Sequence, residues 1–272
     1  MNQITKEVSN AIRVLREKVP LVHNITNYVT VNDCANALLA IGASPIMADD
    51  IAEAADISAV SSALVLNIGT LNQRTVASML AAGKRANELG IPVVFDPVGA
   101  GASKLRNDAT REILEQVRLT VLRGNISEVS FVAGLAVSTK GVDASEADGG
   151  NDAVAVAKAV AEKLGCTAAV TGAVDVIADG KRVAQIRNGH PMLSRVTGTG
   201  CMTSSLVGAY AGALRDGFTA AVAGIASMGI AGELAYEAAG QTGTGIFHIA
   251  IIDALSRLNP VLLEERAKLD EI

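Results

Sequence analysis

Short apolar runs that alternate with longer helix-patterned segments constrain the fold of this chain more than any other feature. Runs such as Ala63 to Ile68 and Ile91 to Pro97 are bounded by turn-forming residues, which is typical of strands buried on both faces. Segments such as Asn72 to Leu89 lie between these runs and are long enough to form helices. This alternation predicts an α/β fold with a mostly parallel central sheet and helices on both of its faces.

The remaining segments follow the same alternation. The pair Asp179-Gly180 joins two apolar runs and predicts a hairpin that adds an antiparallel edge to the sheet. We expect a flexible loop over 98–102 and interpret the weakly patterned stretch from Gly134 to Gly150 as a flap. We expect helices over 5–18, 32–41, 72–89, 107–119, 151–164, 202–214, 220–239 and 247–258, then a charged tail. Strands are expected over 44–48, 63–68, 91–97, 120–122, 167–171, 174–178 and 183–187, and residues 21–27 predict a short strand that runs into a polar loop.

Length and composition exclude several classes of protein. No linker or change of composition divides the 272 residues, so we expect a single domain over 1–272. The net charge is -5 and there is no basic run, which argues against a nucleic-acid partner. The three cysteines are scattered, without a C-x-x-C pair, so neither a disulfide framework nor a zinc site is indicated and a reducing cytoplasm fits.

Membrane insertion and secretion are not expected either. Residues 1–20 mix acidic and basic side chains and do not resemble a signal peptide. The uncharged stretches 197–214 and 218–232 are too polar or too short for membrane spans. We therefore interpret both as helices buried in a soluble protein, with Gly and Ala allowing neighbouring elements to approach closely.

A glycine-rich loop, Gly198-Thr199-Gly200-Cys201, precedes the small-residue run from Met202 to Leu214. Glycine lets the backbone approach a ligand, and the free N–H groups of a helix N-terminus carry about half a positive charge. The loop therefore predicts an anion hole that stabilises a phosphoryl group without a lysine. When the motif is taken alone, a tight turn before a buried helix is the more common explanation of the same residues.

Polar residues follow directly after several of the predicted strands. Ligands of open parallel sheets bind at the carboxyl ends of the strands, so Asp96, the stretch 123–128, Thr171 and the loop 198–201 are expected on one rim. Asp96 and Glu128 are suited to hold Mg²⁺, which takes one or two carboxylates together with water and substrate phosphates. Each also has a structural explanation, because Asp96 can cap a turn before a proline and Glu128 can lie in the first turn of a helix.

Other nucleotide and metal sites have no pattern in this chain. The sequence lacks the P-loop motif G-x-x-x-x-G-K-[S/T], which excludes a P-loop kinase, and no G-x-G-x-x-G opens an early helix, which argues against a dinucleotide site. We interpret His23 as a hydrogen-bonding residue rather than a metal ligand. His190 and His248 have no suitably spaced partners, so no metal triad is predicted with them.

The order and spacing of a set of motifs closely resemble the hydroxyethylthiazole kinase family, the thiazole salvage enzymes of thiamine synthesis. The motifs extend over nearly the whole chain: Val22-His23-Asn24-Ile25-Thr26-Asn27, Gly42-Ala43-Ser44-Pro45-Ile46-Met47, Asn67-Ile68-Gly69-Thr70, Phe95-Asp96-Pro97-Val98-Gly99-Ala100-Gly101, Arg123-Gly124-Asn125, Thr171-Gly172 and Val196-Thr197-Gly198-Thr199-Gly200-Cys201. That family belongs to the ribokinase-like group, so the resemblance implies a three-layer ribokinase-like sandwich. Its glycine-rich loop ends in Cys, as here, where most ribokinase-like relatives have an Asp base.

The resemblance implies phosphoryl transfer from ATP to the hydroxyl of 4-methyl-5-(2-hydroxyethyl)thiazole, with Mg²⁺ as cofactor. It also implies a homotrimer with active sites at the subunit interfaces. The implied site consists of Gly198, Thr199, Gly200 and Cys201 for catalysis, Asn27, Met47 and Gly198 for the thiazole, Arg123, Asn125 and Thr171 for ATP, and Asp96 and Glu128 for the metal. Because Cys201 is placed at a helix N-terminus, its thiol is expected to have a lowered pKa.

Two other functions stay open at this point. One is a related kinase that phosphorylates a pyrimidine or a vitamin alcohol, although the Cys at the end of the loop favours the thiazole enzyme. The other is a catalytically inactive ligand-binding protein of the same fold, which the intact loop Gly198-Thr199-Gly200-Cys201 disfavours.

Overall fold

The computed structural model describes residues 3–135 and 152–272, so the expected flap over 134–150 lies, from residue 136 onward, outside the described part. The strands form one sheet in the order β2-β1-β3-β4-β5-β6-β7-β8-β9. Their bounds are β1 (Leu21–Ile25), β2 (Ser44–Ile46), β3 (Ala63–Asn67), β4 (Val93–Asp96), β5 (Val121–Asn125), β6 (Thr167–Thr171), β7 (Asp175–Ala178), β8 (Val183–Ile186) and β9 (Leu269–Glu271).

Strand directions define the edge of the sheet at which ligands are expected. Pairing is parallel from β2 through β6 and antiparallel from β6 through β9. β2 and β3 lie on opposite sides of β1, so the strand order reverses at β1. Ligands of such sheets bind beside the reversal, at the carboxyl ends of the strands. The predicted parallel sheet and its antiparallel hairpin are confirmed.

The hairpin is not the edge of the sheet, because β9 pairs with β8 beyond it. The sequence predicts only a charged tail at this point. Leu269 is the one apolar residue of β9 and is 5% exposed, whereas the two acidic residues that follow it face solvent. A three-residue strand with one apolar side chain carries no alternation from which it could be predicted.

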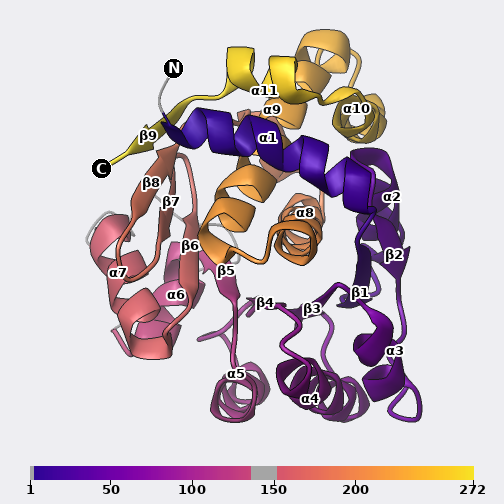
Figure 1. The fold of residues 1–272 in the computed structure, drawn as a ribbon, viewed down its shortest axis with the longest axis vertical. Coiled ribbons are helices and arrows are strands. Elements are labelled where there is room, and N and C mark those ends of the chain that lie inside the picture. The colour runs from indigo at the N-terminus through magenta and orange to yellow at the C-terminus, as the bar shows by residue number, and fades with distance from the viewer. Residues whose placement is uncertain (1–2, 136–151) are drawn as a thin grey trace.

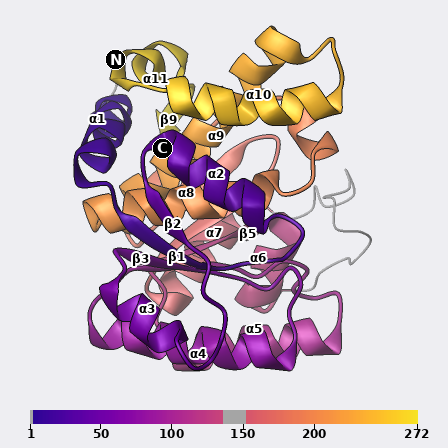
Figure 2. The same ribbon diagram turned by 90° about the vertical axis from the view of Figure 1, so that its right-hand side faces the viewer.

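Helices cover both faces of the sheet (Figure 1). One face buries an apolar cluster against α3 (Ala54–Val60), α4 (Gln73–Glu88), α5 (Lys104–Gln116), α6 (Ile126–Ala133) and α7 (Ala153–Leu164). The other face packs against α2 (Val31–Ile41), α8 (Thr199–Leu214) and α9 (Gly217–Ala239), with α1 (Gln3–Lys18), α10 (Thr244–Arg257) and α11 (Pro260–Arg266) over them. Figure 2 shows this arrangement edge-on, with α4 and α5 below the sheet and α8 above it.

Some boundaries differ from the sequence-based expectation. The predicted strand 120–122 continues to Asn125, because Arg123 pairs with Ala169 and Asn125 with Thr171 in the ladder to β6. Backbone pairing is indifferent to side-chain polarity, so these polar residues are part of the strand rather than of a loop after it. This places the Arg123 side chain on a rigid element.

Helix boundaries move for local reasons. α5 begins at Lys104 instead of the predicted residue 107, because the Ser103 hydroxyl caps it by accepting a hydrogen bond from Arg106 N (3.3 Å). The loop 98–102, predicted to be flexible, is tied down by Gly101 N, which donates to Asn107 Oδ1 at 2.7 Å. α3 is not predicted at all, since its seven residues are too few to show a helical period.

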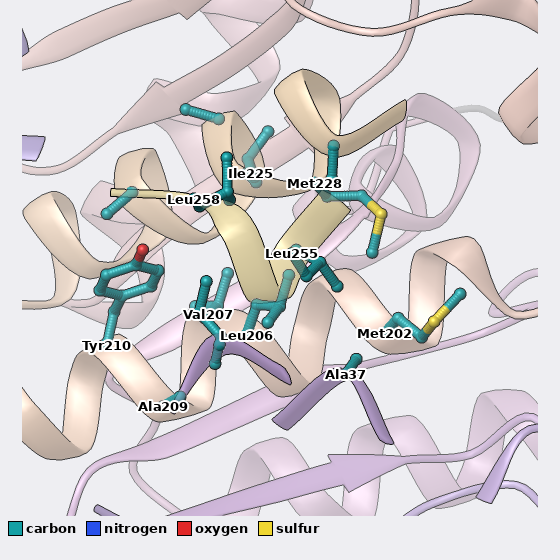
Figure 3. Packing of buried hydrophobic residues seen from close by; sticks show 14 of the residues in the cluster. Ala37, Met202, Leu206, Val207, Ala209, Tyr210, Ile225, Met228, Leu255 and Leu258 are labelled. Atoms are coloured by element: carbon teal, nitrogen blue, oxygen red, sulfur yellow. The ribbon is translucent and has the colours of Figure 1, made fainter. Parts of the chain in front are cut away.

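α8 and α9 are apolar on all sides because they lie inside the molecule. Figure 3 shows Leu206 and Tyr210 of α8 in the cluster that α9 and α10 complete. Tyr210 Oη lies 2.8 Å from Ser227 Oγ, which satisfies the buried phenol. By length and composition α9 could cross a membrane, yet 83% of its apolar window is buried, as in a helix that forms the core of a globular protein.

Candidate active site

The candidate active site extends along the carboxyl ends of β1, β3, β4 and β5, from the strand-order reversal at β1 toward the middle of the sheet. Asn67 ends β3 and Asp96 ends β4, and the two residues are paired in the sheet register. The N-terminus of α8 faces the same edge, because Ser204 of its first turns donates to Asp96 Oδ2 at 2.7 Å. Parallel pairing therefore fixes the floor of the site, and α8 supplies its wall.

Asp96 is the most buried carboxylate of this edge, with 1% of its side chain exposed. Its Oδ2 accepts hydrogen bonds from Asn67 Nδ2 (2.8 Å) and Ser204 Oγ, and Arg123 Nη1 forms a salt bridge with it at 3.6 Å. Its Oδ1 is buried and has no hydrogen-bond partner within residues 3–135 and 152–272. Burial raises the pKa of Asp96, and the Arg123 charge opposes that rise.

Glu128 has a structural role as well as a position suited to a metal. It forms a capping box with Asn125 at the start of α6, in which Asn125 N donates to Glu128 Oε2 at 2.8 Å. Its Oε1 accepts from Gly99 N at 2.8 Å, so it also holds the loop after β4. Burial raises the pKa of Glu128, and the nearby Asp96 charge raises that pKa further.

These two carboxylates fit a divalent cation. Both are buried, the Asp96 charge disfavours ionisation of Glu128, and Asp96 Oδ1 is an acceptor without a partner among the described residues. The described residues contain no group of three or more His, Cys, Asp and Glu side chains that could enclose a metal ion. Two carboxylates and open coordination positions are what Mg²⁺ takes when water and substrate phosphates complete its shell.

The glycine-rich loop forms the start of α8, which begins at Thr199 rather than at the predicted Met202. Gly198 is the N-cap residue and has φ 87°, a left-handed conformation that favours glycine. A Cβ at Gly198 would lie 2.3 Å from Thr30 Cγ2, so the close packing also requires glycine. The first turn of a sixteen-residue helix thus presents free N–H groups at the site.

Thr199 and Gly200 of the loop play different parts. Thr199 Oγ1 donates to Leu193 O at 3.2 Å, which turns this hydroxyl toward the preceding turn η2 (Pro191–Arg195). Gly200 is helical, and a Cβ built there would lie 2.9 Å from Arg123 Nη1. Glycine at this position therefore makes room for the guanidinium and is not required by the backbone dihedrals.

Arg123 joins the carboxylates to the α8 N-terminus. Its side chain is 13% exposed, and its Nε is buried with no hydrogen-bond partner in the described part of the chain. A buried guanidinium with a free N–H is suited to bind an anion, because charge-assisted hydrogen bonds to phosphate are among the strongest in proteins. Thr171, at the end of β6, donates to Gly124 O at 3.2 Å and lies on the same edge.

Cys201 is half-buried, and two amide groups donate to its sulfur. Asn27 Nδ2 lies 2.9 Å and Asn67 Nδ2 lies 3.3 Å from Cys201 Sγ. The expected lowering of the Cys201 pKa is wrong, because burial and the Asp96 charge raise this pKa despite the hydrogen bonds from Thr30 and Asn67. The thiol is consequently protonated at neutral pH and can donate a hydrogen bond but is a poor base.

Met47 lies at the edge of the sheet and not beside the strands that carry Asp96 and Arg123. It follows the outer strand β2, and β1 and β3 separate that strand from β4, which carries Asp96. Met47 is half-buried against the core cluster of the α2 face. The structure therefore brings together the predicted site residues of the central strands and α8, and places Met47 at the edge of the sheet.

The histidines lie in three separate environments. His23 is buried, with Nδ1 2.8 Å from Ser58 Oγ and Nε2 2.6 Å from Ala48 O, so its interpretation as a hydrogen-bonding residue is confirmed. Burial lowers the pKa of His23, so this imidazole is neutral. His190 stacks on Tyr236, and His248 Nε2 lies 2.9 Å from Asp33 Oδ1.

Sequence reasoning missed three polar residues that organise the site. Asn67 was recognisable only as part of a motif, and Ser204 only by its spacing three residues after Cys201, which places both on one face of a helix. Arg106 of α5 donates to Ile68 O and Val98 O, each at 2.6 Å, and so ties the loops after β3 and β4 together. No local pattern indicates this contact, because it depends on how α5 packs.

Comparison with known proteins gives a consistent result. The hydroxyethylthiazole kinase family model matches residues 12–260. A protein of Ruminiclostridium cellulolyticum named hydroxyethylthiazole kinase is 65% identical over 273 residues, which cover 100% of both chains. The solved structure of a hydroxyethylthiazole kinase protein from Pyrococcus horikoshii matches with a TM-score of 0.89 at 42% identity and covers 97% of this chain and 98% of that one.

A more distant structure shows the wider fold. A ribokinase-like superfamily protein of Enterococcus faecalis matches with a TM-score of 0.63 at 11% identity, over 92% of this chain and 95% of that chain. Identity this low supports only a shared fold, and the predicted ribokinase-like architecture is thereby confirmed. The sequence similarity to the hydroxyethylthiazole kinases extends beyond the motifs to the full length of the chain.

Proposed function

The chain belongs to the hydroxyethylthiazole kinase family, and from this premise we propose how its residues divide the work of the reaction. The protein is a kinase that phosphorylates the hydroxyl of 4-methyl-5-(2-hydroxyethyl)thiazole with ATP, giving the phosphate ester and ADP in thiamine metabolism. The observation that carries the assignment of the site is the junction of Asp96, Arg123 and the α8 N-terminus at the carboxyl ends of β4 and β5.

The transferred phosphoryl group binds in front of α8. Charge spreads over the phosphoryl oxygens during transfer, and preorganised donors stabilise it most when they do not need to reorient. The N–H groups of Gly200 and Cys201 belong to a helix anchored by Ser204, so they are rigid. The Nε of Arg123, which has no hydrogen-bond partner among the described residues, adds a charged donor next to them.

Asp96 and Glu128 hold Mg²⁺, which, when bound, neutralises charge on the phosphate oxygens of ATP. Asp96 offers the free acceptor Oδ1, while Asn67 and Ser204 occupy its other oxygen. Glu128 keeps its orientation through the capping box with Asn125. Arg123, Asn125 and Thr171 form the adjoining ATP-binding edge, since β5 and β6 place them next to one another.

Cys201, Gly198 and Asn27 border the alcohol and the thiazole. The phosphoryl-transfer transition state is loose and needs little base assistance, so a protonated thiol at Cys201 does not prevent the reaction. The thiol instead borders the hydroxyl that is phosphorylated. Asn27 fixes the sulfur by donating to it, and its own oxygen is held by Thr30.

The position of Met47 supports a homotrimer in which this residue completes a neighbour's site. Met47 follows the edge strand β2, which α2 contacts, and α10 in turn packs on α2; the apolar side chains of Leu39 on α2 and Ile249 on α10 are 60% and 59% exposed. Apolar surface beside an unpaired strand edge is typical of a subunit interface. We place the enzyme in the cytoplasm, because its three cysteines are free.

An ADP-release assay tests the substrate assignment directly. The thiazole alcohol, hydroxymethylpyrimidine and pyridoxal are each supplied with MgATP, and turnover is compared at saturation. The thiazole should be phosphorylated with the highest kcat/KM, by at least about tenfold. Preference for pyridoxal or the pyrimidine would support the related-kinase alternative, and binding of the thiazole without ADP release would support the inactive one.

A further inference from the structure

Asn67 connects the two ends of the proposed reaction. It ends β3, is 2% exposed, and its amide nitrogen donates to Asp96 Oδ2 at 2.8 Å and to Cys201 Sγ at 3.3 Å. Both N–H bonds of one amide group are therefore used, one on the carboxylate that serves the phosphates and one on the thiol that borders the alcohol.

The orientation of this amide is fixed. Asn67 Oδ1 accepts a hydrogen bond from Gly69 N at 2.9 Å. In the flipped orientation, the NH₂ group would face the Gly69 N–H and the carbonyl oxygen would face the Asp96 carboxylate, and both contacts would be repulsive. A Cβ at Gly69 would lie 2.8 Å from Asn27 Nδ2 and 3.0 Å from Asn67 Oδ1, so the turn also holds the two asparagines close together.

The contacts of Asn67 decide what its neighbours can do. By occupying Asp96 Oδ2 together with Ser204, Asn67 leaves Oδ1 as the free oxygen of that carboxylate. By occupying one lone pair of Cys201 Sγ while Asn27 occupies the other, it leaves the S–H bond to point away from both amides. The carboxylate and the thiol are thus oriented by one side chain.

We propose that Asn67 is a positioning residue that holds the Asp96 carboxylate and the Cys201 thiol in one arrangement, so that the phosphoryl and alcohol ends of the reaction stay aligned. The proposal rests on the function proposed above for this site. It requires that the two neighbours lose their alignment together when the amide is removed. Misalignment of reacting groups lowers the rate of the chemical step more than it weakens binding.

Steady-state kinetics give the first test. Asn67→Ala should lower kcat by about ten- to a hundredfold and change the KM for ATP and for the thiazole by less than about threefold. In the double variant, Cys201→Ala should cost less than it does in the wild-type background, because the Asn67–Cys201 contact is already lost. Additive effects, or a loss confined to KM, would overturn the proposal.

Alkylation of Cys201 gives a readout that does not depend on kinase activity. The titratable or charged groups that act on the Cys201 thiol are Asp96, Arg123 and the Cys34 thiol. Loss of the Asn67 N–H donor removes a hydrogen bond that lowers the thiol pKa, so that pKa should rise. The alkylation rate is compared at two alkaline pH values, because a change in how easily the reagent reaches the sulfur affects both rates equally and cancels in their ratio. The reaction can be followed on the tryptic peptide 196–215, which contains Cys201 as its one cysteine.

For Asn67→Ala we divide the alkylation rate at a pH near the ordinary pKa of a thiol by the rate at a pH well above it. This ratio should be at least about threefold lower than in the wild type. Asn24→Ala is the matched control, since Asn24 is a buried asparagine that accepts a hydrogen bond from Ser205 of α8 at 2.9 Å. The control should keep the wild-type ratio. An unchanged ratio in Asn67→Ala, or an equal change in both variants, would contradict the proposal even if the enzyme phosphorylates the thiazole as expected.

Discussion

The buried carboxylates of Asp96 and Glu128 are the negatively charged groups that we assign to the metal. Asp96→Asn and Glu128→Gln should each lower kcat by about tenfold or more, with partial recovery at high Mg²⁺ concentration. Because burial raises the pKa of both groups, activity of the wild type should fall with decreasing pH at a higher pH than for an ordinary carboxylate. Turnover measured against Mg²⁺ and pH checks both effects.

The matched control is Asp108→Asn, which removes a carboxylate that is 47% exposed on α5. It should leave turnover and the metal dependence unchanged. Near wild-type turnover in both Asp96→Asn and Glu128→Gln would remove these residues from the site, whereas a loss in all three variants would indicate a nonspecific effect of charge.

Asp175 is expected to lower the stability of the folded protein at neutral pH. Burial raises its pKa to about 6, while Gly172 N, which donates to it at 2.9 Å, opposes the rise. A carboxyl group whose pKa is raised in the folded state binds its proton more tightly when the protein is folded. The free energy of unfolding therefore declines as the pH rises from the ordinary pKa of an Asp toward 6. Asp175→Asn keeps an acceptor for Gly172 and should remove this decline, which is on the order of 2 to 3 kcal/mol.

Thermal or denaturant unfolding at acidic and neutral pH measures this effect. The variant and the wild type should be similarly stable near pH 4, and the variant should be more stable at pH 7.5. A variant that is less stable than the wild type at both pH values would show that the charged form of Asp175 is favoured in the folded protein.

At the scale of elements, the N-terminus of α8 explains which substitutions in the glycine-rich loop matter. Gly198 has a left-handed φ of 87° and packs on Thr30, whereas Gly200 is helical and the described atoms nearest to a Cβ there belong to the guanidinium of Arg123. Gly198→Val should therefore abolish turnover, and Gly200→Ala should chiefly raise the KM for ATP. Steady-state kinetics with thermal melts to confirm folding distinguish the two outcomes, and the reverse order of severity would contradict this view of the loop.

The side chain of Cys201 should matter less than the helix that carries it. Cys201→Ala should keep measurable activity, because the backbone N–H groups survive the substitution. Cys201→Asp should also be active, since the amides of Asn27 and Asn67 already donate to this position and would do the same to a carboxylate. A folded but inactive Cys201→Ala enzyme would make the thiol essential.

Close packing of α9 against α8 depends on small residues. A Cβ at Gly224 would lie 2.7 Å from Val207 N, a backbone atom that cannot rotate away. Gly224→Ala should destabilise the protein by about 1 to 3 kcal/mol, as overpacking does. Gly180→Ala is the control, because no atom of the described residues lies within 4 Å of the added carbon. Equal stability of the two variants in denaturant unfolding would contradict the described packing.

At the scale of the whole molecule, the sheet could be predicted from the sequence because each buried strand is a short apolar run between turn-forming residues. The strand 167–171 was predicted with its observed bounds, and the edge that carries Asp96 follows from the direction of the strands. β9 could not be predicted, since its three residues depend on pairing with β8. Whether residues 269–271 form a strand is decided by their pairing with β8, which no local sequence pattern indicates.

For the candidate site, the sequence likewise indicates the residues that stand at the ends of elements but not the contacts made between distant parts of the chain. Asp96, Glu128 and the loop 198–201 stand at ends of elements, where spacing in the sequence reveals them. The rise in the Cys201 pKa, the role of Ser204 and the contacts of Asn67 depend on burial and on atoms distant in the sequence, so only the folded structure shows them.

The N–H groups at the start of α8 are the part of the whole molecule on which the proposed chemistry depends most. Their ¹⁵N amide signals can be followed while ADP, Mg²⁺, aluminium fluoride and the thiazole alcohol are added together as a mimic of the transferring phosphoryl group. We expect the signals of Gly200 and Cys201 to shift strongly with this complete mixture and weakly with ADP alone. Unchanged Gly200 and Cys201 signals, with shifts confined to other parts of the chain, would contradict the assignment of the phosphoryl site to the N-terminus of α8.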